Sequence, residues 1–124
     1  MKYLLIMNIN PAIMEELTEA ERREIMDGHG DFIKTVRESG EMIGTAALAD
    51  PSQSAVVRVR DGVPVVTDGP YLEAKEFLGG YYLVDVASRD RALELAALIP
   101  DARVDGMGIE VRQVIFSDDG GPSA

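Results

Sequence analysis

Cysteine is absent from this 124-residue sequence. Its absence excludes a disulfide framework, a thiolate metal site and a cysteine nucleophile. A chain without cysteine is compatible with a reducing compartment, and we expect the protein to be cytoplasmic. At this length one compact domain with one core is expected, because two domains would each be too small.

Basic residues are scarce, since 12 Lys and Arg stand against 22 Asp and Glu and give a formal net charge of -10. Nucleic-acid binding needs clustered positive charge against phosphate, so this class of partner is excluded. A long hydrophobic run is missing as well, because the opening MKYLLIM ends at Asn8. That run is too short for a signal peptide or a membrane span, and we expect no membrane partner.

The patterns that are present begin with a strand and a helix. Residues 2–9 form an apolar run typical of a buried central strand. Thr18 and Glu21 have the spacing of a capping box at the start of a helix, and Gly40 is a natural end for it. The apolar stripe of this helix consists of Ile25, His29, Phe32, Ile33 and Val36.

A hairpin is predicted in the middle of the chain. Residues 41–49 can form a short strand, and Asp61 with Gly62 predicts a two-residue turn between two more strands. Pairing across this turn places Val57, Val59, Pro64 and Val66 on one face and Arg58, Arg60, Val63 and Val65 on the other. Because Pro64 cannot donate to a ladder, the hairpin is expected at an edge.

The last third of the chain repeats the strand and helix pattern. Residues 80–87 read as a strand, and Ser88 can cap a helix that Pro100 ends. Residues 108–116 form the last predicted strand. Residues 117–124 are polar and rich in glycine, and we expect a disordered tail there.

This order of elements predicts an α+β fold. It matches a ferredoxin-like antiparallel sheet with two helices on one face plus an extra β-hairpin, formed by a single domain over residues 1–116. Such a sheet leaves its second face uncovered. The strands are too apolar for that face to lie in water, so we expect a second copy to cover it in a homodimer.

The stretch VTDGPYLEAKEFLGG, residues 66–80, inserts a rigid turn and alternating charges between two strands. Pro70 fixes its own φ and can begin a single helical turn. In one interpretation Asp68 serves the turn and accepts a hydrogen bond from the first amide after Pro70. In the other, the turn holds the Asp68 carboxylate where it orients an acid–base group. Glu73 and Lys75 either line the same loop or are solvated surface charges.

The runs VTDGPYLEAKEFLGGYYLVDV, RALELAALIP and IEVRQV resemble the DGPF-type branch of the YCII-related family, small bacterial proteins with a dimeric α+β barrel fold. The resemblance covers residues 1–116 and implies that fold here. Two positions depart from the family pattern, with Tyr71 where Phe is typical and Gln113 where the closing EVRP motif has Pro. Tyr71 adds a hydroxyl, and Gln113 restores a backbone donor.

His29 is the only histidine, and it lies on the apolar helical stripe between Gly28 and Gly30. Each glycine inside a helix costs about 1 kcal/mol relative to Ala, so the pair suggests that another element approaches the helix closely. One interpretation makes His29 a core residue satisfied by a single hydrogen bond. The other makes it a proton carrier, because imidazole titrates near neutral pH.

The resemblance implies a helix histidine and an acidic residue paired in an active site, and one relative is a dehydrochlorinase that acts on an aromatic ring. His29 matches the histidine, and Asp68 is our candidate partner, which would fix the tautomer and favour imidazolium. The hypothesis is a lyase or isomerase that acts on a small molecule by general acid–base chemistry. The candidate substrate-binding residues are Tyr71, Glu73, Lys75, Arg58 and Arg112, the two arginines for an anionic substrate.

A non-catalytic interpretation stays open. DGPF-type relatives often accompany, or are fused to, sigma factors of the extracytoplasmic-function class, which implies a ligand-binding or regulatory domain. We expect no metal, because one His without Cys leaves only carboxylate ligands and no calcium-loop spacing occurs. We also expect no cofactor, because the glycines of DGHGD lie within a helical pattern and lack the strand-turn-helix context of a phosphate loop.

Overall fold

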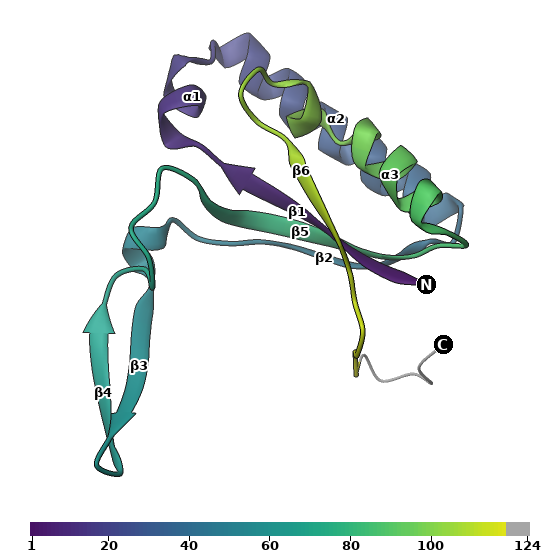
Figure 1. Ribbon diagram of the computed structural model, residues 1–124. Helices are drawn as coiled ribbons and strands as arrows, with labels where there is room; N and C mark the ends of the chain where they lie inside the picture. The colour runs from purple at the N-terminus through teal and green to yellow at the C-terminus, as the bar shows by residue number, and fades with distance from the viewer. Residues whose placement is uncertain (119–124) are drawn as a thin grey trace.

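The computed structural model describes residues 1–118 of the chain (Figure 1). In chain order its elements are β1 (Lys2–Ile9), α1 (Pro11–Glu16), α2 (Glu19–Glu38), β2 (Met42–Ala47), the 3-10 helix η1 (Pro51–Gln53), β3 (Ala55–Arg60), β4 (Val63–Asp68), β5 (Phe77–Asp85), α3 (Arg89–Leu98), the 3-10 helix η2 (Pro100–Arg103) and β6 (Ile109–Gln113). Residues 119–124, which make up most of the predicted disordered tail, lie outside the described residues.

Four strands form the main sheet in the order β2-β5-β1-β6, and all three neighbouring pairs are antiparallel. Helices α2 and α3 lie side by side on one face of this sheet (Figure 1). Strands β3 and β4 form a separate two-stranded sheet. The predicted ferredoxin-like α+β fold with an extra hairpin is therefore confirmed.

The core lies between the main sheet and the two long helices. Alternation along the central strand β1 directs Tyr3, Leu5 and Met7 toward the helices, and all three are buried. The other fully buried large side chains come from β5, α2, α3 and the residue after α3, and they are Val84, Val36, Leu95 and Ile99. Burial of one sheet face against two helices therefore accounts for the hydrophobic core.

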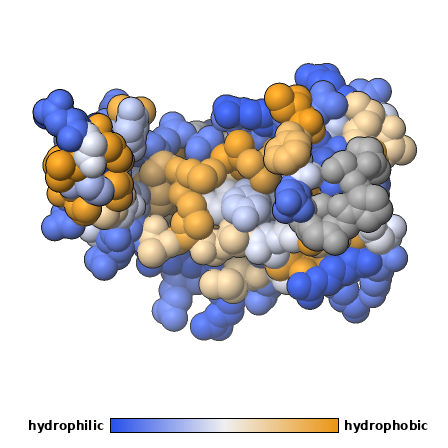
Figure 2. All heavy atoms as spheres, turned by 90° about the horizontal axis from the view of Figure 1, so that it is seen from below, coloured by the Kyte–Doolittle hydropathy of each residue, from blue (hydrophilic) through white to orange (hydrophobic). Residues whose placement is uncertain are grey.

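The opposite side of the main sheet carries no helix, and we call it the open face (Figure 1). The register pairs Leu4 with Leu83 and Ile6 with Tyr81 on this face. Figure 2 looks onto it and shows hydrophobic side chains on the hairpin and on the part of the sheet beside it. An apolar sheet face of this kind is a candidate interaction surface.

The capping signals in the sequence mark helix ends in the structure as predicted, and the structure contains one further short helix. Thr18 and Glu21 form the predicted capping box at the start of α2. The short helix α1 was not predicted from the sequence. Its Asn10 side chain accepts from the first free amides, and Pro11 stands at its first position. Among residues 1–118, no helix is both long and apolar enough to span a bilayer.

The hairpin has the predicted register, with Val57 opposite Val66 and Val59 opposite Pro64. Asp61 and Gly62 both have positive φ, of 50° and 75°, which is the requirement of a tight hairpin turn whose twist matches its strands. Figure 1 shows the hairpin projecting away from the main sheet, on the side opposite the helices. Apart from Val56, all its strand residues are exposed.

The DGP stretch does not form the single helical turn that the sequence allowed. Residues 69–76 connect β4 to β5 without regular secondary structure. The Gly69 amide donates to the Ser54 carbonyl at 2.7 Å, which ties the start of this loop to the residue before β3. Gly69 has φ of 106°, a left-handed conformation that favours glycine, and this conformation directs the chain out of the hairpin.

Candidate active site

His29 lies on the sheet-facing side of α2, and both of its ring nitrogens have partners. Nε2 lies 2.8 Å from Oδ1 of Asp101, and Nδ1 lies 2.7 Å from the hydroxyl oxygen of Tyr82. The His29 side chain is 22% exposed, so the ring is enclosed on most sides but reaches the surface. The three side chains come from α2, η2 and β5, three elements far apart in sequence.

Asp101 is the buried charged residue of the site, with only 4% of its surface exposed. An ionised carboxylate is expensive to bury without a partner, and its hydrogen bond to Nε2 of His29 supplies one. The Asp101 carboxylate accepts, so Nε2 carries the proton. Neutral His29 then has its lone pair on Nδ1, which accepts from the Tyr82 hydroxyl.

Tyr82 is only 2% exposed and packs against Phe32, with 4.6 Å between ring centroids. Burial, with a further contribution from the nearby Asp101 charge, raises the pKa of Tyr82 to about 12. The phenol is therefore protonated across the physiological range and can donate to Nδ1 of His29. The result is a continuous chain of hydrogen bonds from Tyr82 through His29 to Asp101.

A close contact between α2 and η2 brings Asp101 to His29. Pro100 stops α3 and begins η2, as the sequence predicted for the helix end, and Asp101 follows it directly. A Cβ atom added at Gly28 would lie 2.5 Å from Cγ of Pro100, so only glycine lets the two elements meet this closely. Gly30 has no such neighbour, because nothing lies within 4 Å of the corresponding position. The expected close approach of another element is therefore confirmed at Gly28 and wrong at Gly30.

The predicted contact between His29 and Asp68 does not form within the chain. Asp68 ends β4 on the hairpin, is exposed, and lies on the opposite side of the main sheet from α2 (Figure 1). The reason is topological, since the helices cover one face of the sheet and the hairpin leaves from the other. Asp101 and Tyr82 were both missed by the sequence analysis, which treated their segments as a helix stop and a strand.

The predicted substrate-binding residues form no single cluster with His29. The Arg58 guanidinium lies 5.4 Å from the centre of the Tyr71 ring, in cation–π contact at the hairpin. Glu73 and Lys75 are exposed in the loop that follows. Arg112 extends from β6 and pairs with Glu110 on the same strand. The structure therefore joins two of the five, and the hydrogen-bond partners of His29 are Tyr82 and Asp101 instead.

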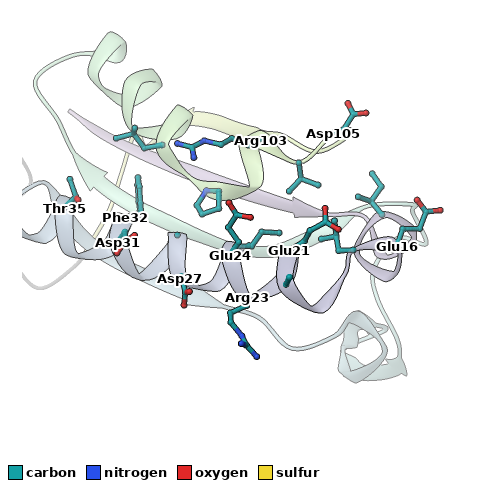
Figure 3. Close-up of a pocket in the computed structure, with 18 residues that line it drawn as sticks. Glu16, Glu21, Arg23, Glu24, Asp27, Asp31, Phe32, Thr35, Arg103 and Asp105 are labelled. Atoms are coloured by element: carbon teal, nitrogen blue, oxygen red, sulfur yellow. The ribbon is translucent and has the colours of Figure 1, made fainter.

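Two grooves on the surface of residues 1–118 lie near the residues described above. The first, which we call the helix groove, has a volume of about 1170 Å³ and runs along α1, α2 and η2 (Figure 3). Gly28, Phe32 and Pro100, which are neighbours of the His29 cluster, line it, whereas His29, Tyr82 and Asp101 themselves are not lining residues. Its charged lining residues are Glu16, Glu21, Glu24, Asp27, Asp31 and Asp105 against Arg23 and Arg103. This excess of carboxylates favours neutral or cationic molecules over anions.

The second, which we call the loop groove, has a volume of about 610 Å³ and lies between residues 48–54 and 70–78. Tyr71, Leu72 and Phe77 are among its apolar lining residues. Neither groove offers a metal site, since within residues 1–118 no group of three or more His, Asp or Glu side chains is arranged to hold an ion.

Comparison with known proteins shows which family the chain belongs to. Residues 1–116 match the family model described as the YCII-related domain. A relative, an uncharacterized protein of Rhizobium meliloti (strain 1021), is 30% identical over 112 residues, which are 90% of this chain and 90% of the relative. Two independent comparisons thus agree over nearly the whole length, and the chain belongs to the YCII-related family.

Proposed function

We propose that the protein is a cofactor-independent acid–base enzyme, a lyase or isomerase of small molecules, with His29 as its base and Asp101 as the residue that orients it. The observation that carries the proposal is the hydrogen-bond chain from Tyr82 through His29 to the buried Asp101 carboxylate. A carboxylate fixed on one imidazole nitrogen sets the tautomer and stabilises the imidazolium that forms when the other nitrogen takes a proton. Asp101 thus takes the role that sequence reasoning gave to Asp68.

Of the three side chains only His29 reaches the surface, because it is 22% exposed whereas Tyr82 and Asp101 are 2% and 4% exposed. The substrate C–H proton therefore passes to Nδ1 of His29, after the Tyr82 hydroxyl has given up its hydrogen bond to that nitrogen. The products of this step are a substrate carbanion, a neutral Tyr82 and an imidazolium held by Asp101. The carbanion then expels a leaving group, as in a lyase, or takes the proton back at another carbon, as in an isomerase.

The substrate is a small neutral or cationic molecule with an acidic C–H bond beside a carbonyl group. The acidic lining of the helix groove supports this class and disfavours the anionic substrate that Arg58 and Arg112 were expected to hold. A carbonyl group beside the C–H bond lowers the barrier enough for a neutral imidazole to act as base.

Deuterium incorporation tests the activity without knowledge of the natural substrate. A panel of small carbonyl compounds is incubated with the protein in D2O, and proton NMR follows the loss of C–H signal. We expect at least one compound to exchange with the wild-type chain and none to exchange faster than the solvent blank with His29→Gln. Ligand binding with no exchange across the panel would favour a non-catalytic protein.

The orienting role of Asp101 has its own test, because the chain holds one histidine and its ring signals need no further assignment. Nitrogen NMR should show the proton on Nε2 in the wild-type chain and in Asp68→Ala. In Asp101→Ala the preference for this tautomer should be lost. An unchanged tautomer in Asp101→Ala would remove the basis for the pairing.

A second candidate is a ligand-binding or regulatory protein, in line with the sigma-factor association implied by resemblance to the DGPF-type branch. The loop groove supports it, because about 610 Å³ with a mostly apolar lining suits a small molecule. Under both candidates the chain works as a homodimer, and the apolar open face supports this arrangement. Sedimentation of the purified chain at micromolar concentration tests the dimer, which a monomer would contradict.

A further inference from the structure

Two apolar surfaces outside the core have no cover within the described chain. The first is the hairpin face, formed by Val57, Val59, Pro64 and Val66, all of them exposed. The second is the C-terminal pair, Ile115 and Phe116, which follows β6 and is 97% and 80% exposed. Single exposed apolar residues are normal, but six gathered on two short segments indicate an interaction surface.

The hairpin in particular needs a contact outside its own chain. A two-stranded ribbon is marginally stable in water unless one face packs against something. Here both strands are almost wholly exposed, and Figure 1 shows the ribbon standing away from the main sheet. Its well-defined register and turn therefore point to a partner that covers the hairpin face.

The two surfaces lie at opposite ends of the open face and on the same side of the molecule. In Figure 1 the hairpin descends below one end of the sheet, and the chain after β6 descends below the other end. The open face lies between them, with Leu4, Ile6 and Leu83 on it. A protein surface about as wide as this sheet, packed against the open face, would contact the hairpin at one end and the chain after β6 at the other.

We propose that this surface belongs to a second copy of the chain, turned end for end, so that the hairpin face of each copy packs on the C-terminal pair of the other. This inference rests on the homodimer proposed above and specifies how it is built. A two-fold axis makes both contacts at once, since each copy supplies one hairpin and one C-terminal pair. The alternative orientation sets hairpin beside hairpin, so that both arms project into the same space and leave both C-terminal pairs uncovered.

The size of the sheet supports an additional contact at each end of the interface. We call this contact, between the hairpin face of one copy and the C-terminal pair of the other, the clasp. The four strands have 8, 6, 9 and 5 residues, about seven on average. At about 4.8 Å between strands and about 3.3 Å per residue their footprint is roughly 440 Å². A stable interface buries about 800 Å² per partner, which is nearly twice this footprint. The sheets alone are therefore too small, and the hairpin face and the C-terminal pair supply the remaining apolar area.

Disulfide trapping tests the arrangement directly, because a chain without cysteine forms only the bridges that are engineered into it. Val66→Cys and Phe116→Cys are prepared separately, mixed, allowed to exchange subunits under reducing conditions and then oxidised. We expect a disulfide-linked dimer in the mixture and little or none from either variant alone. Val65→Cys, on the other face of the hairpin, is the matched control and should not cross-link to Phe116→Cys.

Each other outcome counts against the clasp. Efficient cross-linking of Val66→Cys alone would show that hairpins meet each other and would overturn the end-for-end arrangement. A chain that sediments as a dimer without any Val66 to Phe116 bridge would overturn the clasp and leave the dimer standing. A monomer in sedimentation would overturn both.

A variant without cysteine gives an independent measurement. Phe116→Asp places a charge in the proposed contact and changes no side chain in the core of its own copy. We expect its dimer dissociation constant to rise at least tenfold, while Asp68→Asn, at the exposed end of β4, should change it less than threefold. Equal dissociation constants for wild-type and Phe116→Asp would contradict the contact.

Discussion

The chain carries two aspartates that sequence reasoning or structure connects with His29, and their surroundings differ completely. Asp101 follows a proline-stopped helix, is 4% exposed and bonds Nε2 of His29. Asp68 belongs to the conspicuous DGP turn, yet it is exposed on a hairpin on the far side of the sheet. The unusual local sequence therefore marks a bend in the chain, whereas the carboxylate that bonds His29 lies in an ordinary stretch that folding buries beside the imidazole.

Removing each of the two carboxylates in a separate variant gives the largest expected difference in the free energy of unfolding. Asp101→Ala leaves Nε2 of His29 without its acceptor in an enclosed site, and hydrogen bonds to charged groups contribute up to about 3 kcal/mol. We expect a loss of about 3 kcal/mol in the free energy of unfolding for Asp101→Ala. Asp68→Ala should stay within about 0.5 kcal/mol of wild type, as exposed substitutions do.

Urea denaturation measures both aspartate variants at one protein concentration. Asp101→Asn is the intermediate case, because its amide oxygen can still accept from Nε2. Equal stability of Asp101→Ala and Asp68→Ala would show that the buried hydrogen bond contributes nothing to the fold.

A pH experiment sharpens the same comparison at β5, where neighbouring tyrosines point to opposite faces. The folded-state pKa of Tyr82 is raised to about 12, against a reference value of 10.0. Between these values the unfolded chain loses the phenol proton while the folded chain keeps it, so stability falls as pH rises from about 10 to 12. Each pH unit of this shift corresponds to about 1.4 kcal/mol, so the expected loss is roughly 3 kcal/mol.

Tyr82→Phe should lack this part of the alkaline loss, and Tyr81→Phe, on the open face, should retain it. Denaturation midpoints collected at several pH values from 9 to 12 separate the two variants, because the alkaline effects of Lys and Arg are common to both. A Tyr82→Phe profile that runs parallel to wild type would exclude Tyr82 as the cause.

The glycines beside His29 provide a comparison within one helix. At Gly28, overpacking against Pro100 costs about 2 kcal/mol. The better helix propensity of Ala offsets about 1 kcal/mol of this, so Gly28→Ala should lose about 1 kcal/mol. Gly30→Ala meets nothing within 4 Å and should gain up to about 1 kcal/mol.

The tautomer of His29 shows how the structure responds to the methyl group of Gly28→Ala. It distinguishes a clash that stays local from one that shifts η2. If Pro100 moves away from the added methyl, Asp101 moves with it, and the preference for a proton on Nε2 should weaken in Gly28→Ala alone. A stabilised Gly28→Ala with an unchanged tautomer would mean that the contact with Pro100 relaxes without moving Asp101.

The sequence allowed the fold to be predicted more fully than the site, and the residues show why. Capping by Thr18 and Glu21 and the turn at Asp61 and Gly62 are local signals, because the partner groups lie within a few residues. Asp101 is 72 residues from His29, so no spacing or periodicity connects them. The useful signals were indirect, namely Gly28 on the apolar stripe and a polar residue directly after the helix-ending Pro100.

The smallest expected effect comes from an ion pair at the other end of the helix-covered face. Glu41, just before β2, accepts two hydrogen bonds from the Arg91 guanidinium of α3, at 2.9 and 3.0 Å. These bonds are the main reason that the pKa of Glu41 lies below its usual value. The stabilising contribution is therefore complete above about pH 4.5 and disappears as pH falls through the lowered value.

Because Arg91 is partly exposed, Glu41→Gln should lose less than about 1 kcal/mol at neutral pH and show a shallower loss of stability in acid than wild type. Glu110→Gln is the matched control, since its partner Arg112 is more exposed and lies on the same strand, so the pair joins no two elements. If the two variants lose the same stability, the ion pair between Glu41 and Arg91 contributes nothing beyond an exposed pair on one strand. If only Glu41→Gln responds, the helix-covered face is held by polar contacts at both of its ends, through Asp101 near one and Arg91 near the other.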